Sequence, residues 1–278
     1  MIYLDHAATT KPDKEVTEAM LPYLGKQFLN PSAFYQPAVR VRVKLDDARR
    51  EIADFIHADP RAIYFTSGGT EADNWALRIA VTAMAGKGRH IISSPVEHPA
   101  VRNSLQYLRK LGFEISFTEI SREGLVDVDQ LKDMIREDTI LISVMHANNE
   151  IGTIEPIEEI GKLAADRGIL FHTDAVQTFG HIPIDLRKCH IDLLSASAHK
   201  LYGPKGVGLQ RRRKNPLPRA CGLWDPHGGI PEDPAVQPGP GDEGGGPELH
   251  REGASFDHSW GVRVNRAPDR KRTLPGRP

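Results

Sequence analysis

Cysteine is scarce in this chain, with 2 residues among 278, and this scarcity excludes a fold held together by a disulfide framework. No run approaches the roughly 18 consecutive apolar residues of a membrane-spanning helix. The N-terminus lacks the basic region and the apolar stretch of a signal peptide. A formal net charge of −1 lacks the basic excess that nucleic-acid binding requires. We therefore expect a cytoplasmic protein with no nucleic-acid and no membrane partner.

Several sequence motifs of enzyme sites are also absent. The chain contains neither G-x-G-x-x-G nor G-x-x-x-x-G-K-[ST], which disfavours nucleotide binding. It contains neither H-E-x-x-H nor C-x-x-C, and its 12 histidines show no metal-ligand spacing. We expect no metal site.

What the chain has is an alternation of short apolar runs and helical patterns. Ala38, Val41, Leu45, Ala48, Ile52 and Phe55 recur at helical spacing. Further helices are predicted over Leu131–Ile135 and Ile157–Ala164. Strands that alternate with helices favour an α/β fold with a mostly parallel sheet and helices on both of its faces.

Polar clusters follow the apolar runs at the points where strands are predicted to end. Because the carboxyl ends of parallel strands lie on one edge of the sheet, these clusters should converge there. The runs and the residues that follow them are Ala62–Phe65 before Thr66 to Asp73, His90–Val96 before Glu97-His98-Pro99, Thr139–Met145 before His146 to Glu150, Gly168–Thr173 before Asp174 to Gln177, and Ile191–Ala196 before Ser197 to Lys200.

Lys200 stands where a strand would deliver it into such a site. Partial burial lowers the pKa of a lysine and favours the uncharged amine that forms imines, for which pyridoxal phosphate is the common partner. A solvated or ion-paired lysine is the alternative. Asp174 could hold the pyridine nitrogen of that cofactor, or could merely cap the next turn.

The segment Thr66-Ser67-Gly68-Gly69-Thr70 opens a predicted helix and could bind a phosphate. Glycines let backbone N–H groups approach an anion, and the helix N-terminus adds partial positive charge. Thr70 and Asp73 also fit the capping pattern of an ordinary helix start. His98 could lie with its ring against a planar cofactor if the clusters converge.

The residues resemble a known family, the cysteine desulfurases, which are pyridoxal-phosphate enzymes of the class V aminotransferase group. The resemblance is ordered and continuous from Met1 to about Leu209. It is carried by Tyr3-Leu4-Asp5-His6-Ala7-Ala8-Thr9-Thr10, Thr66 to Glu71, Glu97-His98, Asn148-Asn149-Glu150-Ile151-Gly152, His172 to Gln177, and Ser197 to Gly206. It implies a fold-type I large domain, a homodimer, L-cysteine as the substrate and a sulfur-acceptor protein as a possible partner.

The resemblance also implies roles for the matching residues. Lys200 would be the Schiff-base lysine, Asp174 the partner of the pyridinium nitrogen, and Gln177 a donor to the ring hydroxyl. His98 would stack on the ring and transfer protons, and Asn149 would face the ring hydroxyl and the substrate carboxylate. Residues Gly69, Thr70, Ser197 and His199 would hold the phosphate.

The composition changes after Leu209, where glycine, proline and arginine become frequent and aliphatic residues rare. We expect an N-terminal segment at 1–15, a large cofactor-binding domain at 16–209 that is incomplete, and a disordered tail at 210–278. A truncation, a shifted reading frame or a sequence error near Leu209 would explain the change.

The family's substrate-binding arginine, its loop cysteine and its C-terminal small domain are not recognisable in the tail. Arg263 is a poor candidate for the arginine, Cys189 is expected to be a packing residue, and Cys221 lies in the tail. The leading hypothesis is a cysteine desulfurase that converts L-cysteine to L-alanine with persulfide transfer, impaired in this chain. The alternatives are another class V enzyme, such as a selenocysteine lyase or an aminotransferase, and a non-catalytic remnant that binds the cofactor.

Overall fold

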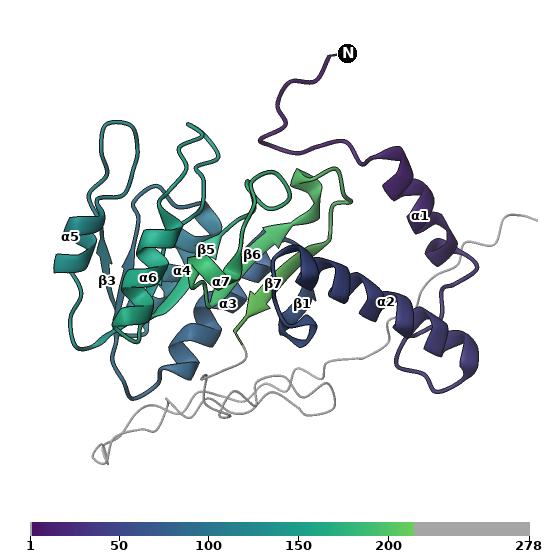
Figure 1. Cartoon of the computed structure of the whole chain (residues 1–278), viewed down its shortest axis with the longest axis horizontal. Coiled ribbons are helices and arrows are strands. Elements are labelled where there is room, and N and C mark those ends of the chain that lie inside the picture. Colours follow the sequence, from purple (N-terminus) through teal and green to yellow (C-terminus); the bar gives the residue numbers. More distant parts are fainter. Residues whose placement is uncertain (1, 214–278) are drawn as a thin grey trace, which may run out of the picture. The chain divides into compact units, whose positions relative to one another are not determined.

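The computed structural model describes residues 2–213, in which seven strands form one sheet in the order β1-β7-β6-β5-β4-β2-β3 (Figure 1). Strands β2 to β6 are parallel to one another, whereas β7 runs antiparallel to both β1 and β6. The strands are β1 (Ile63–Thr66), β2 (His90–Ser93), β3 (Glu114–Phe117), β4 (Thr139–Ser143), β5 (Leu170–Asp174), β6 (Leu193–Ser197) and β7 (Gly208–Arg212). The predicted α/β fold with a mostly parallel sheet is confirmed.

Seven α-helices and two short 3₁₀ helices accompany the sheet in the described part of the chain. They are α1 (Lys14–Leu24), α2 (Gln36–Phe55), η1 (Pro60–Ala62), α3 (Gly69–Ala83), α4 (Pro99–Lys110), α5 (Val128–Asp133), α6 (Ile157–Asp166), α7 (Leu186–Cys189) and η2 (Ala198–Lys200). The helix predicted at Leu131–Ile135 begins earlier, because Asp127 caps it by accepting a hydrogen bond from the backbone N–H of Gln130. The helix predicted at Ile157–Ala164 is α6.

Two hydrophobic clusters separate the helices onto the two faces of the sheet, because successive strand residues point to opposite sides. Ile91 and Leu141 pack with α3 and α4, whereas Ile92 and Ile142 pack with α5, α6 and the end of α2. Figure 1 shows α6 and α7 in front of the sheet and α3 and α4 behind it. Helices therefore cover both faces, as predicted.

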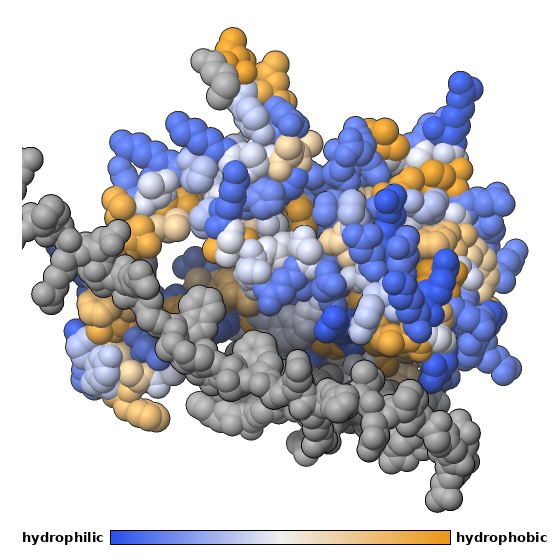
Figure 2. Space-filling view, turned by 180° about the vertical axis from the view of Figure 1, so that it is seen from behind, coloured by the Kyte–Doolittle hydropathy of each residue, from blue (hydrophilic) through white to orange (hydrophobic). Residues whose placement is uncertain are grey.

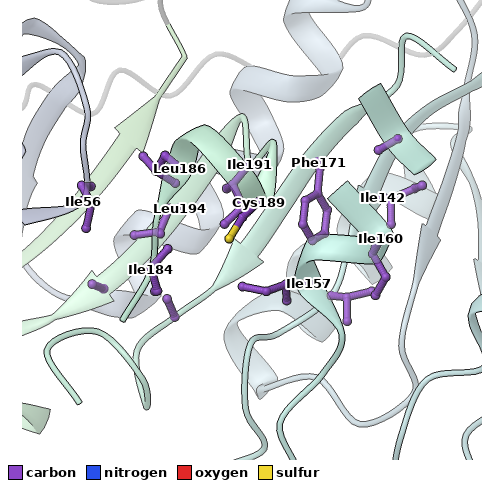
Figure 3. Close-up of a cluster of buried hydrophobic side chains, with 14 of the residues drawn as sticks. Ile56, Ile142, Ile157, Ile160, Phe171, Ile184, Leu186, Cys189, Ile191 and Leu194 are labelled. Atoms are coloured by element: carbon purple, nitrogen blue, oxygen red, sulfur yellow. The ribbon is translucent and has the colours of Figure 1, made fainter. Parts of the chain in front are cut away.

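Cys189 lies within the second of these clusters. Its side chain is 3% exposed and packs among Ile157, Phe171 and Ile191 (Figure 3). Burial raises the pKa of its thiol, so the reactive thiolate is disfavoured. The prediction that Cys189 is a packing residue is confirmed.

The N-terminal region contributes little to either cluster. Helix α1 contains no buried residue, and Ile2, Leu4 and Leu24 are more than two-thirds exposed. Apolar side chains stand out at the N-terminal end of the chain, at the top of Figure 2. The part of this region that matters for the site is the short segment before α1, which reaches the ends of the strands.

Strand β7 continues past the boundary predicted at Leu209. Its last residues, Gln210 to Arg212, pair with β1 and β6, so regular structure persists to Arg212. Gly208 permits the approach of β7 to the loop before α3, because a Cβ at this position would lie 2.5 Å from the backbone carbon of Gly68. Residues 214–278, most of the predicted tail, with Cys221 and Arg263, lie outside the described residues.

Candidate functional site

An open cavity of about 530 Å³ lies at the carboxyl ends of the parallel strands. It gathers residues from the five polar clusters that the convergence argument placed at this edge, and also from the N-terminal segment at Asp5, Ala7 and Ala8. Every site residue predicted from the sequence lines it: Gly69, Thr70, His98, Asn149, Asp174, Gln177, Ser197, His199 and Lys200. The cavity is therefore the candidate active site.

Lys200 enters the cavity from η2, directly after β6. Its Nζ donates hydrogen bonds to the backbone oxygens of Ala7 and Ala8, the latter at 3.0 Å. Burial lowers the pKa of the amine, and the negative charges of Asp174 and Asp5 oppose this shift. The side chain is thus half-buried and favours the uncharged amine more than a solvated lysine does, as expected.

Asp174 ends β5 and is 5% exposed. Its Oδ1 accepts a hydrogen bond from the backbone N–H of Val176 at 2.9 Å, so the carboxyl does stabilise the following turn. Burial raises its pKa, while the Val176 N–H and the charges of His98 and Lys200 lower it. The same side chain also lines the cavity, so the two interpretations of Asp174 are compatible.

The start of α3 offers backbone donors to the cavity. The N-cap residue is Gly68, with no side-chain cap, so the alternative interpretation of Thr70 as the helix cap does not hold. The first N–H groups of a helix lack intrahelical partners and favour an anion. Ser197 Oγ is buried beside them without a hydrogen-bond partner among the described residues. Together these groups form a set of donors that could bind an anion.

Three other predicted residues are held by hydrogen bonds within the chain. His98 is the N-cap of α4, and its Nδ1 accepts from the backbone N–H of Ala100 at 3.1 Å, which leaves the ring proton of the neutral imidazole on Nε2. Gln177 donates to the Ala7 oxygen at 3.0 Å, and Asn149 donates to Glu150 at 2.7 Å. The amides of Gln177 and Asn149 therefore have partners within the chain.

The chain is similar to known proteins over most of the described residues. The sequence profile of the family described as Aminotransferase class-V matches residues 2–236. The chain belongs to the aminotransferase class-V family. The match extends beyond Leu209, where the resemblance was predicted to end.

Curated relatives of this class-V chain carry the name cysteine desulfurase IscS. The relative from Dictyoglomus turgidum is 54% identical over 213 residues, which are 77% of this chain and 54% of the relative. The relative from Methanosarcina thermophila is 50% identical over 213 residues, 77% of this chain and 53% of the relative. The chain thus spans about half the length of the curated relatives it matches.

Solved structures with a similar fold agree with this assignment. The structure titled "SspA in complex with cysteine" is 39% identical with a TM-score of 0.75, over 77% of this chain and 62% of that one. The apo cysteine desulfurase from Thermococcus onnurineus NA1 is 33% identical with a TM-score of 0.71, over 77% of this chain and 54% of that one. No helix within residues 2–213 is long and apolar enough to cross a membrane.

Sequence reasoning missed two parts of the site. The backbone of Ala7 and Ala8 holds both Lys200 and Gln177, although only the family resemblance marked this segment. Asp73, interpreted as a helix cap, is instead a buried carboxyl that lines the cavity. The sequence feature that could have identified Asp73 is a charged residue on the apolar face of a predicted helix.

Asp73, His98 and Asp174 form a group whose nearest side-chain donor atoms all lie within 4.8 Å of one another. Two buried carboxyls this close cannot both stay ionised without a positive charge or a proton beside them. The charge state of the two carboxyls therefore matters for what the cavity can bind.

Proposed function

We propose that this chain is a pyridoxal-phosphate-dependent enzyme of the cysteine desulfurase type. One observation carries the proposal: a half-buried lysine, a buried carboxylate and an unpartnered buried hydroxyl beside a helix N-terminus line a single cavity. An imine-forming amine, a partner for a ring nitrogen and a set of phosphate donors are the three requirements of this cofactor.

The residues present fit the cofactor. Ser197 Oγ, buried and without a partner, and the uncapped start of α3 would hold the phosphate together with Thr70 and His199. Asp174 would accept a hydrogen bond from the protonated ring nitrogen and so keep it protonated, and Lys200 would attach the cofactor through its amine. The N–H groups at the start of a helix suit a dianionic phosphate better than they suit a neutral group.

When bound, pyridoxal phosphate withdraws electrons from a substrate amino acid and so weakens the bonds at its α-carbon and β-carbon. The chain supplies the groups around that chemistry. Lys200 can give and take a proton at Nζ, because burial lowers the pKa of its amine. His98 accepts the Ala100 N–H at Nδ1, so its Nε2–H is the group that can donate toward the cavity.

The substrate that we propose is L-cysteine, with L-alanine as the product and the sulfur transferred to a thiol as a persulfide. The relatives from Dictyoglomus turgidum and Methanosarcina thermophila support this choice by name, and SspA by its bound cysteine. Cys189 cannot be the acceptor from its described position, because it is buried in the core and does not line the cavity. We therefore propose that the chain is impaired in sulfur transfer unless a thiol from elsewhere, such as a sulfur-acceptor protein, enters the site.

The first experiment tests attachment of the cofactor. The full chain is loaded with pyridoxal phosphate, reduced with borohydride and digested, and the modified peptide is identified by mass spectrometry. We expect the label on Lys200, its loss in Lys200→Ala, and its retention in the control Lys188→Ala, since Lys188 is exposed in α7. A label that persists unchanged in Lys200→Ala would refute the assignment.

The second experiment tests the reaction. Alanine formation from L-cysteine is measured with and without an added small-molecule thiol. We expect slow alanine formation that the thiol accelerates, and an unchanged rate in Cys189→Ser. Cofactor attachment without any alanine, at every thiol concentration, would reject the desulfurase function and leave only cofactor binding.

The assembly belongs to the same proposal. The family resemblance implies a homodimer, and sedimentation of the loaded chain measures its mass directly. A mass equal to that of one chain at micromolar concentration would contradict this part.

A further inference from the structure

Asp73 is a buried carboxyl that opens onto the candidate site. It lies in the first turns of α3, is 1% exposed and lines the cavity. Its Oδ1 has no hydrogen-bond partner among the described residues. The mechanism proposed above does not use it. A carboxyl group in such a position needs either a positive charge or a proton.

Among the described residues, no positive charge lies within hydrogen-bond distance of Asp73. The closest basic nitrogen, Nε2 of His172, is 3.6 Å away, which is too long for a hydrogen bond. Burial lowers the pKa of His172 to about 3, so its ring is neutral. Its Nδ1 is hydrogen-bonded to the Ser143 hydroxyl at 2.9 Å, and its Nε2 is hydrogen-bonded to the Ser195 hydroxyl at 3.1 Å. His172 therefore fills the space beside Asp73 without compensating its charge.

Asp174 is the neighbour that sets the charge of Asp73. Their nearest oxygens lie within 4.8 Å, and two buried carboxylates so close repel each other. The pair is asymmetric. Asp174 accepts a hydrogen bond from the backbone N–H of Val176, and the charge of Lys200 also lowers its pKa. For Asp73, the Ser195 hydroxyl is the single group among the described residues that lowers its pKa.

We propose that Asp73 is a positioning residue that keeps a proton at neutral pH, so that the pair carries one negative charge and this charge lies on Asp174. The inference rests on the proposed function only where it makes Asp174 the partner of a ring nitrogen. Burial and the charge of Asp174 raise the pKa of Asp73 well above its usual value, in agreement with the geometry. A protonated Asp73 removes repulsion and offers its O–H as a donor toward the cavity.

All titratable groups around the pair enter any pH dependence. Asp174 and His172 come from β5, Glu97 and His98 from the turn between β2 and α4, and Lys200 from η2. Glu97 is the one that must be distinguished from Asp73, because burial raises its pKa to about 8. It hydrogen-bonds to Ser94 and to the backbone N–H of Met145, away from the pair.

Infrared spectroscopy of the full chain without cofactor tests the proton directly. A protonated carboxylic acid has a carbonyl stretch that a carboxylate lacks. We expect Asp73→Asn to lose one such band at neutral pH, and the control Glu97→Gln to lose a different one. If Asp73→Asn loses no protonated-acid band, Asp73 is ionised and the proposal is wrong.

The pH dependence of stability gives a second readout that a purely structural role would not change. A group whose pKa is raised on folding stabilises the folded state at low pH, and this contribution is lost as the pH rises. We expect Asp73→Asn to gain stability relative to wild type as the pH is raised from mildly acid to mildly alkaline. A constant difference between the two proteins would overturn the proposal.

The reciprocal variant tests the coupling, since interacting groups titrate as a pair. In Asp174→Asn the repelling charge is removed, so the Asp73 band should disappear at a lower pH than in wild type. An unshifted midpoint would show that Asp174 does not set the charge of Asp73. A band that appears only after chelator treatment would show that a bound cation neutralises the pair, which also overturns the proposal.

These measurements need no cofactor. Their outcome can therefore contradict the proposal for Asp73 while cofactor attachment to Lys200 is observed, and cofactor attachment can be absent while the proposal for Asp73 holds. In the loaded chain, we expect Asp73→Asn to bind pyridoxal phosphate within about twofold of wild type at neutral pH, since one neutral group replaces another. A tenfold change in affinity at neutral pH would indicate that Asp73 was charged.

Discussion

Strand β7 contains a residue whose replacement should stabilise the protein. Gln210 is 0% exposed, although β7 lies between β1 and β6, where an apolar side chain would pack better. Its Nε2 donates to the backbone oxygen of Arg211 at 3.0 Å, but its Oε1 is buried with no partner among the described residues. We expect Gln210→Leu to raise the free energy of unfolding.

The magnitude follows from two opposing terms. A buried polar atom without a partner costs about 1–3 kcal/mol, and the hydrogen bond lost from Nε2 contributes about 0.5–1.5 kcal/mol. Leucine also buries more apolar surface than glutamine, at about 25 cal/mol per Å². The net gain should be about 1–2 kcal/mol, or an increase in Tm of about 2–4 °C for each kcal/mol in a domain of this size.

Guanidinium denaturation of the full chain, followed by circular dichroism, measures this gain as a higher midpoint at an unchanged slope. Gln106→Leu is the matched control, because Gln106 is exposed on α4 and its replacement should change stability by less than about 0.5 kcal/mol. A lower midpoint for Gln210→Leu would refute the reasoning, since it would require a partner for Oε1. Because β7 pairs with β6, a more stable β7 should also stabilise β6, the strand that precedes Lys200.

Three further predictions concern the site and its surroundings. Gly208→Ala should cost more free energy of cofactor binding than free energy of unfolding, because the added Cβ would displace the Gly68 backbone before α3. A cofactor titration with an unchanged Kd would contradict this. Asp174→Ala should weaken cofactor binding by about 10- to 150-fold, the equivalent of a charge-assisted hydrogen bond of roughly 1.5–3 kcal/mol, and Asp174→Glu by less; equal affinities in an absorbance titration would exclude the assigned role. Burial lowers the pKa of His146 to about 4 and of His172 to about 3, so the unfolded chain binds protons at a higher pH than the folded chain does, and stability should fall as the pH drops below about 6.5. In the double variant His146→Gln, His172→Gln, the midpoint of acid denaturation should therefore move to lower pH; a midpoint that moves toward neutral pH would contradict this.

The arrangement of the strand ends could be predicted from the sequence because it depends on a simple rule. Each apolar run is followed by polar residues, and parallel strands bring those residues to one edge. His98, Asp174 and Lys200 are separated widely in sequence, yet all three line the cavity. Element boundaries were less predictable, as the early start of α5 at Val128 shows.

Strand β7 could not be predicted, because Gln210, Arg211 and Arg212 do not have the composition of a strand between two others. The pairing is set by tertiary contacts. Arg211 donates to the backbone oxygens of Ile191 and Asp192, and Arg212 lies over the ring of Tyr64 at 5.5 Å. Side-chain contacts of this kind are not visible in local sequence, so the sequence did not predict β7.

The polar residues that sequence reasoning undervalued share one physical property, which is that each interrupts an apolar pattern. Asp73 lies on the face of α3 that also buries Ala76, Leu77 and Ala80. His172 follows Phe171 in a strand buried along its whole length. A charge or an imidazole in such a position lowers stability unless it is neutral and hydrogen-bonded, so its presence indicates a protonation state as well as a location. The neutral ring of His172 leaves Asp73 without a cationic partner within hydrogen-bond distance among residues 2–213. This is the observation behind our proposal that Asp73 holds the proton and Asp174 the charge.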